Sequence, residues 1–371
     1  MATIAEKLIA MEHVRFSRKL FVCLLAGLIV GAVLRRIMAR YFVTLLSPIT
    51  IWGLFLLCLL IYLGYAFVWQ WKEKKGRGNS PARLIFFQSI IAYTLAFDLA
   101  SFGWQKIFHL QMVVPLGVLD LPFNSLDGET LTWAYFRRSY PFTVTIAISQ
   151  MVSAYLLLWP RTRLLGLICM IPILLNIILI DFFYHLPVGV LLHAIILMAG
   201  VIYLLMQYHT SLVNFFFRTL PAAITTATIN RRTRYILRTA VILTPLVLLL
   251  TYTYPDKHPQ FTGKYVVSHL MVNARSIVVH STKDSVLTTV YMDWQDDFVL
   301  EFNNYNNRYI GTYSYDPATD SLHVQWRYPA AFNMPFSGSL KKAAKKGDYS
   351  FVGQMGADLI EMRLERLPEP K

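Results

Sequence analysis

The sequence LIFFQSIIAYTLAFDLASFGWQKIF at residues 84–108 opens a run of four apolar segments that decides the fold. The other three follow at 140–160, 164–184 and 187–208. Each is long enough to cross a bilayer, which takes about 20 apolar residues in a helix. The second, third and fourth segments are joined by only two or three residues. These neighbours are therefore predicted to be antiparallel helical hairpins in a membrane.

Further apolar segments flank this block on both sides. Two spans are predicted before it, a short one at Leu20–Leu34 and another within Val43–Trp71, followed by a charged linker with Gly and Pro. After the block, residues 209–238 contain several arginines and are predicted to lie on the membrane surface as an amphipathic segment. A last span is expected at 235–254. The prediction is a membrane all-α helical bundle of about seven transmembrane helices.

The tail of the chain has a different hydrophobic period. In SLHVQWR at 321–327, apolar and polar residues alternate, which is typical of a half-buried strand. Similar runs recur at hairpin spacing, and Asp316-Pro-Ala-Thr-Asp320 supplies turn residues between two of them. Eight or nine short strands are expected, forming an all-β antiparallel barrel or sandwich. The predicted domains are two N-terminal spans with a linker (1–83), the four-helix block (84–208), a surface segment with the seventh span (209–257) and the β domain (258–371).

Charge indicates how the chain is oriented. Residues 255–371 carry 13 Lys and Arg against 13 Asp and Glu, so the formal net charge of +14 lies entirely in residues 1–254. With the N-terminus inside, the inner segments hold 16 Lys and Arg and the outer ones hold five. Because cytoplasmic loops are enriched in Lys and Arg, the N-terminus is expected in the cytoplasm and the β domain outside it. A nucleic-acid binder would carry its excess charge on a soluble face, so nucleic acid is not an expected partner.

A few polar residues inside the block are the candidate ligand-binding residues, since polar groups in hydrocarbon are costly and tend to be functional. They are Asp98, Lys106, Gln150, Asn176, Asp181 and His193. The predicted topology brings Lys106, Asp181 and His193 to a similar depth near the outer leaflet. We expect them to converge on one polar pocket beneath the 109–139 loop, with Asp98 deeper.

Structural alternatives remain open for several of these residues. Lys106 is near a span end and would there extend its ammonium group to the interface. Asp98 must be protonated or paired, and a hydrogen bond to Gln150 or to a backbone carbonyl would satisfy it. Within the 109–139 loop, Asp127 is expected to cap a short helix that ends at Arg138. That helix is either an interfacial element or a lid over the polar site.

Residues 84–208 resemble the DoxX-like family of bacterial integral membrane proteins. The resemblance rests on FGWQKIF at 102–108, on Trp133 through SYPF at 139–142, on LLLWPRT from residue 156, and on NIILIDFFYHLP at 176–187. It implies a four-helix bundle best known from a membrane subunit of thiosulfate:quinone oxidoreductase. Gly103 and Lys106 match the family's Gly-x-x-Lys position. Gln150 stands where relatives often have an acid, which weakens a proton-handling role there. The β tail resembles one that some family members carry.

The expected function follows from this bundle and its polar residues. We predict an integral protein of the bacterial inner membrane that binds a quinone-like or other small amphiphilic molecule as an accessory or redox-associated subunit. The alternative is a non-enzymatic envelope scaffold or transport component that acts through its β domain. The three cysteines lie in apolar segments and form no metal or dithiol motif, so no metal and no covalently bound cofactor is expected. Expected partners are the lipid bilayer and an envelope or redox protein.

Overall fold

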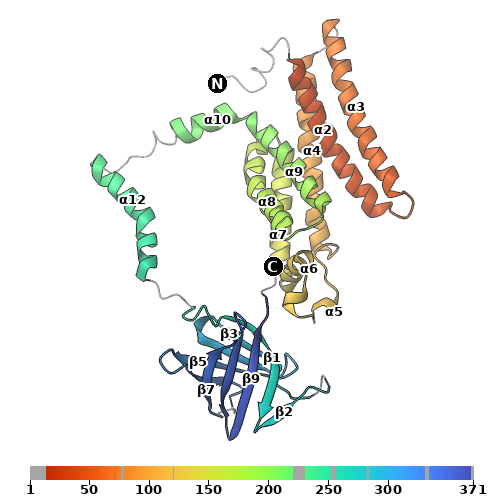
Figure 1. The fold of residues 1–371 in the computed structure, drawn as a ribbon. Helices are drawn as coiled ribbons and strands as arrows, with labels where there is room; N and C mark the ends of the chain where they lie inside the picture. The colour runs from red at the N-terminus through yellow and green to blue at the C-terminus, as the bar shows by residue number, and fades with distance from the viewer. Residues whose placement is uncertain are drawn as a thin grey trace. The chain divides into compact units, whose positions relative to one another are not determined.

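Two structural units make up the chain. The computed structural model describes residues 14–76, 79–119, 121–219, 230–251, 256–281, 284–330 and 334–368. The units are Met1–Thr226, which is helical, and Ala227–Lys371, which carries the strands (Figure 1).

Six helices among the described residues are long and apolar enough to cross a membrane. They are α2 (Phe16–Tyr41), α3 (Pro48–Lys74), α4 (Ser80–Ile107), α7 (Tyr140–Leu158), α8 (Arg163–Phe183) and α9 (Val188–Met206). The four segments predicted at 84–208 are thus confirmed as helices, and the chain is a multi-pass membrane protein. The span predicted at Leu20–Leu34 is also confirmed as a helix, and α2 continues beyond that apolar run for seven more residues to Tyr41.

Helix α4 is the centre of this bundle and packs against α2, α7 and α9. Buried residues of the first two N-terminal helices join the same apolar core as the later helices, for example Val22 and Ile29 with Leu95 and Leu197. Close approach of α4 and α7 depends on Gly103, where an added Cβ would lie 2.5 Å from a side-chain carbon of Met151.

Between α4 and α7 the chain forms α5 (Leu116–Leu119), a 3-10 turn (Phe123–Ser125) and α6 (Gly128–Arg138). The predicted cap of α6 is confirmed, since the Asp127 side chain accepts a 2.9 Å hydrogen bond from the Thr130 N–H. Hydrogen bonds from Thr130 hold the pKa of Asp127 below its usual range. At Gly128 an added Cβ would meet the Tyr184 carbonyl oxygen at 2.1 Å, so α6 begins directly against the end of α8.

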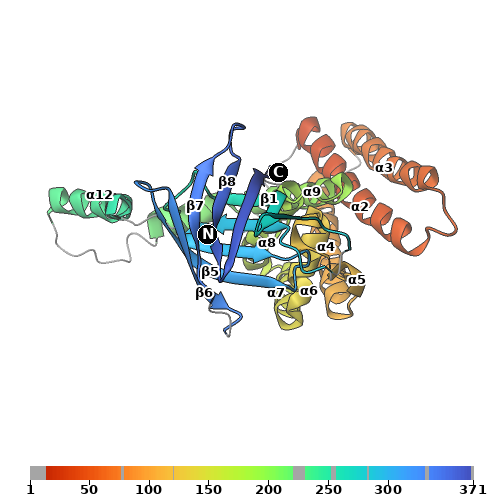
Figure 2. The same cartoon turned by 60° about the horizontal axis from the view of Figure 1, so that its bottom comes forward.

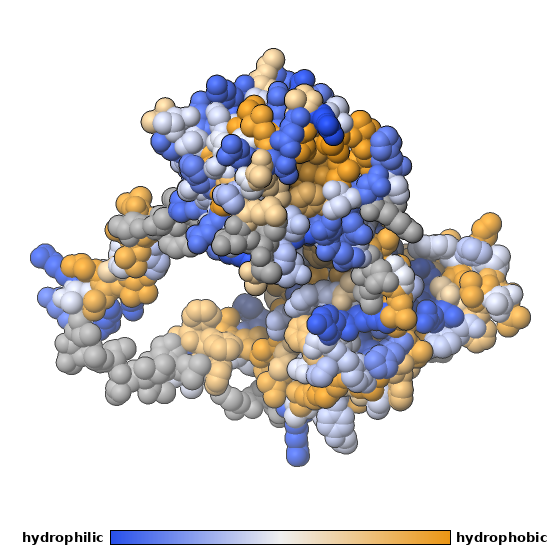
Figure 3. Space-filling model, turned by 90° about the horizontal axis from the view of Figure 1, so that it is seen from below, coloured by the Kyte–Doolittle hydropathy of each residue, from blue (hydrophilic) through white to orange (hydrophobic). Residues whose placement is uncertain are grey.

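The segment predicted as a seventh span begins as α12 (Arg231–Leu248), after α10 (His209–Asn214) and a π-helical turn (Phe215–Thr219). It continues in a 3-10 turn (Leu249–Thr251), and residues 252–254 of the predicted span lie outside the described residues. Because α12 has four arginines among its first eight residues, it is not among the six helices apolar enough to span a membrane. No described residue of α12 is buried, and its surface is divided between hydrophilic and hydrophobic residues (Figure 3, left).

The described strands form a closed antiparallel barrel. They are β1 (Gly263–Val272), β2 (Arg275–Ile277), β3 (Thr289–Asp293), β4 (Asp297–Glu301), β5 (Arg308–Asp316), β6 (Ser321–Tyr328), β7 (Phe336–Lys342), β8 (Tyr349–Met355) and β9 (Asp358–Arg366). Strands β3 to β9 pair in sequence order, β1 pairs with β3, and β1 with β9 closes the ring (Figure 2). The short β2 extends β1 as a hairpin and is not part of the ring. The all-β antiparallel prediction is confirmed, and of its two forms the barrel is correct.

Large apolar side chains fill the inside of the barrel. Tyr265, Phe298, Phe336 and Phe351 are each less than 2% exposed. Phe336 and Phe351 stack with their centroids 4.8 Å apart. This interior is a packed core, as small eight-stranded barrels commonly have.

Candidate functional site

Asp98 is fully buried in α4 and has two partners from other helices. Its Oδ1 lies 2.7 Å from Arg36 Nη2 on α2, and its Oδ2 lies 2.7 Å from His193 Nε2 on α9. The arginine contact is an ion pair. The alternative expectation, a partner in Gln150 or a backbone carbonyl, was wrong. A buried carboxylate is costly unless paired, and here one cation and one imidazole join three helices at it.

Arg36 reaches this site because α2 extends beyond its apolar stretch. Because the apolar run ends at Leu34, Arg36 was predicted to lie in the outer loop. In the structure the Arg36 guanidinium also donates to the Ser101 hydroxyl and lies 4.2 Å from the centroid of the Phe102 ring. The sequence did contain a signal for this contact. Two arginines lie at the end of one span, and an acid without a partner lies in another.

Lys106 lies in the last turn of α4 and is 4% exposed. The ammonium group of Lys106 therefore does not reach the surface. The structural alternative, in which it extends to the interface, was wrong. Its Nζ donates to Gln111 Oε1 at 3.1 Å and lies 5.5 Å from the centroid of the Phe102 ring. Gln111 comes from the loop that follows α4, and the sequence analysis did not single it out.

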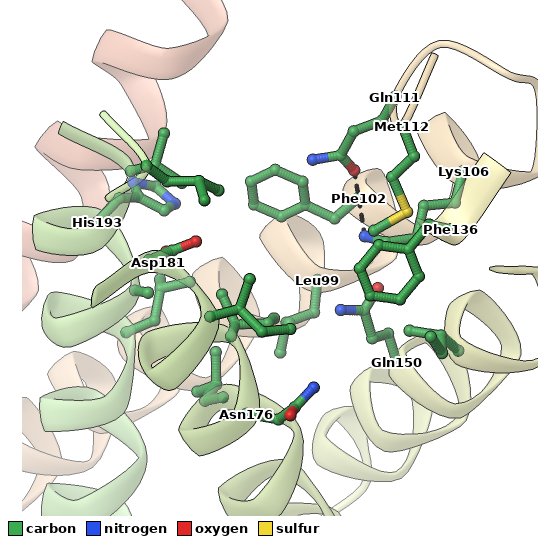
Figure 4. Close-up of a pocket in the computed structure, with 18 of the residues that line it drawn as sticks. Leu99, Phe102, Lys106, Gln111, Met112, Phe136, Gln150, Asn176, Asp181 and His193 are labelled. Atoms are coloured by element: carbon green, nitrogen blue, oxygen red, sulfur yellow. Dashed lines mark hydrogen bonds between the residues drawn. The ribbon is translucent and has the colours of Figure 1, made fainter. Parts of the chain in front are cut away.

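A cavity lies among α4, α7, α8 and α9, with a water-accessible volume of about 90 Å³. Most of its lining is apolar, from residues such as Leu99, Leu174 and Leu197. Five of the six candidate residues line it: Lys106, Gln150, Asn176, Asp181 and His193. Figure 4 shows these side chains around one space, with the Lys106–Gln111 hydrogen bond on one side and Asp181 with His193 on the other. Asp98 stands behind His193, outside the lining.

Several polar atoms around the cavity lack a partner among the described residues. Gln150 Oε1, Asp181 Oδ2 and His193 Nδ1 are buried and make no hydrogen bond there. They come from three different helices, α7, α8 and α9. Since nearly all buried polar groups in proteins are hydrogen-bonded, three such atoms around one cavity favour a site that receives a polar group. Asn176 lines the cavity and is also exposed, so the cavity is open on that side.

Helix α6 covers one end of this cavity. Trp133 and Phe136 both contribute to its lining, as do Gln111 and Met112 of the preceding loop. The 109–139 segment therefore has the position expected of a lid, rather than that of an interfacial helix alone. The geometry provides a mostly apolar chamber with a few hydrogen-bonding groups, which is the usual composition of a small-molecule site.

Comparison with known proteins finds one relative and assigns no function. A sequence of Bacillus subtilis (strain 168), described as the uncharacterized protein YwoB, is 33% identical over 118 residues. The match covers 31% of this chain and 70% of the relative. No protein-family model and no solved structure matches the chain.

Proposed function

We propose, for a chain that belongs to the same family as YwoB of Bacillus subtilis, that the helical bundle binds a small amphiphilic molecule. The observation that carries this is the cavity bordered by unpartnered polar atoms of Gln150, Asp181 and His193. The rest of the lining is largely apolar, so the ligand has an apolar body and a polar head. A quinone-like molecule belongs to this class, as the DoxX-like resemblance implies.

The cavity chemistry suits a head group with hydrogen-bond acceptors. Lys106 Nζ is a donor, and the amides of Gln150 and Asn176 supply both donors and acceptors. The Asp98–His193 contact holds the imidazole with Nε2 toward the carboxylate, which leaves Nδ1 for the ligand. The apolar tail would enter through the open side near Asn176, from the lipid. The described residues contain no group of three or more His, Cys, Asp and Glu side chains that could hold a metal ion. The accessory or redox-associated role that we assign to the protein is the one that the DoxX-like resemblance implies.

A scaffold role remains the alternative, and one observation favours it for the β domain. The barrel interior is filled by Tyr265, Phe298 and other large side chains. A partner would therefore contact its outer surface. Both roles are compatible in one chain, since the cavity and the barrel belong to different units.

We further infer that the protein lies in the inner membrane with its N-terminus in the cytoplasm, on the count of Lys and Arg between the spans. That orientation puts the α6 end of the cavity near the outer leaflet. The barrel is then extracytoplasmic only if α12 also crosses.

Extraction of the purified protein tests the proposed function. The protein is purified in nanodiscs, and bound small molecules are identified by mass spectrometry against empty nanodiscs. We expect an enriched amphiphile, at roughly one per protein, which is lost in a Gln150→Leu, His193→Phe variant that fills the cavity. If the wild-type protein and this variant carry the same lipids, the cavity does not bind an amphiphile and the scaffold role takes its place.

A further inference from the structure

Two buried ionisable side chains in the described part of the bundle, Lys106 and Asp181, have no ion-pair partner there, and both line the cavity among α4, α7, α8 and α9. Lys19 is fully buried and pairs with Glu73, and Asp98 pairs with Arg36. Lys106 is 4% exposed, yet no acidic group of the described residues lies within ion-pair distance of it. Its hydrogen-bond partner is the neutral oxygen of Gln111. Because a buried ammonium group is strongly disfavoured without an anion, the missing counterion points to a ligand.

A second cavity, on the other side of Lys106, is lined by basic side chains. Its water-accessible volume is about 370 Å³, and we call it the antechamber. Lys106, Arg137 and His109 line it together with uncharged residues, and no acidic residue does. Arg137 on α6 makes no ion pair within the described chain. The His109 ring stacks on Tyr140 at 4.3 Å between centroids, and the Tyr140 hydroxyl donates to the Ile107 carbonyl, which fixes this wall.

The two cavities meet at Lys106. Both are lined by Lys106, Gln111, Met112 and Phe136, so these side chains form the boundary between the antechamber and the apolar chamber. Asp181 lines the far side of the chamber and is absent from the antechamber. A negative head group would be repelled by Asp181 and attracted at the boundary. The charges therefore set one orientation, with the anionic group of the head at the Lys106 boundary facing the antechamber and the rest of the molecule in the chamber.

We propose that the bound molecule is a single-tailed amphiphile with an anionic head group, a carboxylate or a phosphate, which pairs with Lys106 and Arg137. This inference rests on the proposed function and names its ligand class. A neutral head, such as that of a quinone, would leave Lys106 without a counterion. An anionic head supplies the charge that the protein lacks there, and the apolar chamber takes the tail.

Binding of ligands that share one tail and differ in head group tests the charge. The full-length protein is placed in nanodiscs of zwitterionic phosphatidylcholine, and tritiated laurate is measured by scintillation proximity. The competitors are dodecyl phosphate, dodecanol, dodecyltrimethylammonium and inorganic phosphate. We expect dodecyl phosphate to compete at least ten times better than dodecanol or the cation. Inorganic phosphate should compete weakly, because it has no tail to bury.

Two arginines next to each other on α6 provide a matched pair of variants. Arg137 lines the antechamber, whereas Arg138 is exposed and lines neither cavity. Arg137→Gln should weaken laurate binding about tenfold, and Arg138→Gln, which loses the same charge, should leave it unchanged. Lys106→Met should cause a larger loss. Arg137 is partly exposed, so its replacement tests the site even if the Lys106 variant folds poorly.

The outcomes separate this inference from the proposed function. If dodecanol competes as well as dodecyl phosphate, or if the two arginine variants behave alike, the anionic head group is wrong and an amphiphile site remains. If inorganic phosphate competes equally, the ligand is a free anion and the assigned tail is wrong. If neither laurate nor any neutral amphiphile binds, both the inference and the proposed function are overturned.

Discussion

Replacing Arg36 by Met should destabilise the helical bundle strongly, because it leaves the carboxylate of Asp98 buried without a cation. Asp98 is fully buried and Arg36 is 18% exposed at the side chain. Removal of one partner of a buried ion pair costs about 3–5 kcal/mol. Since the Arg36 end is partly exposed, we expect the lower end of this range, about 3 kcal/mol. That loss shifts the unfolding equilibrium by roughly two orders of magnitude.

A double mutant isolates the cause of this loss. Asp98→Asn removes the charge but keeps an acceptor for His193, and the partly exposed Arg36 retains its contacts with Phe102 and Ser101. We expect this single change to cost about 1–2 kcal/mol. In the double variant no unpaired buried charge is left at the Asp98 position. It should therefore be more stable than Arg36→Met alone, which is a coupling that independent sites do not show.

The measurement is equilibrium unfolding in mixed detergent and sodium dodecyl sulfate micelles, followed by helical circular dichroism. Arg35→Met is the control, because Arg35 stacks over Trp52 at 5.0 Å and makes no ion pair in the described part of the chain. It should cost under about 1 kcal/mol. The reasoning is refuted if Arg36→Met is within about 0.5 kcal/mol of the wild type, or if the double variant loses the sum of the two single losses.

The elements of the fold could be predicted because each has a clear hydrophobic period. Apolar runs of about 20 residues gave the membrane helices, and alternation gave the strands, as at Leu322, Val324 and Trp326. The closure of the barrel could not be predicted. It depends on the pairing of β1 with β9, for example Tyr265 with Arg366, and no local pattern specifies a contact between residues about 100 positions apart.

The candidate site could be predicted only in part, for a related reason. Asp181 and His193 stand out from apolar surroundings, and burial of such groups is costly enough to single them out. Arg36 did not stand out, because an arginine at the end of an apolar run is normal at a membrane surface. Gln111 and Met112 lie in an irregular loop where periodicity gives no information. The ion pair of Asp98 was missed because its partner was assigned to the loop.

Three further predictions concern the cavity, the orientation and the barrel. Lys106→Met should reduce amphiphile binding, whereas Asp181→Asn should strengthen it, because that change removes a charge that repels an anionic head group. A loss of binding in both variants would mean that the head group binds at Asp181. A reporter fused after Lys371 should be active on the extracytoplasmic side if α12 crosses the membrane, and activity in the cytoplasm would mean that only the six apolar helices do. The fragment 256–371 should fold alone and lose stability above about pH 10. Burial raises the pKa of Tyr265 to about 12, and a tyrosine in an unfolded chain titrates near 10. The folded state therefore keeps its proton longer, so its stability is complete below pH 10 and declines as the pH rises toward 12. Thermal melts between pH 8 and 12 measure this decline, which Tyr265→Phe should make shallower by up to about 1.4 kcal/mol per pH unit. An equally steep decline in that variant would show that the buried phenol is not responsible.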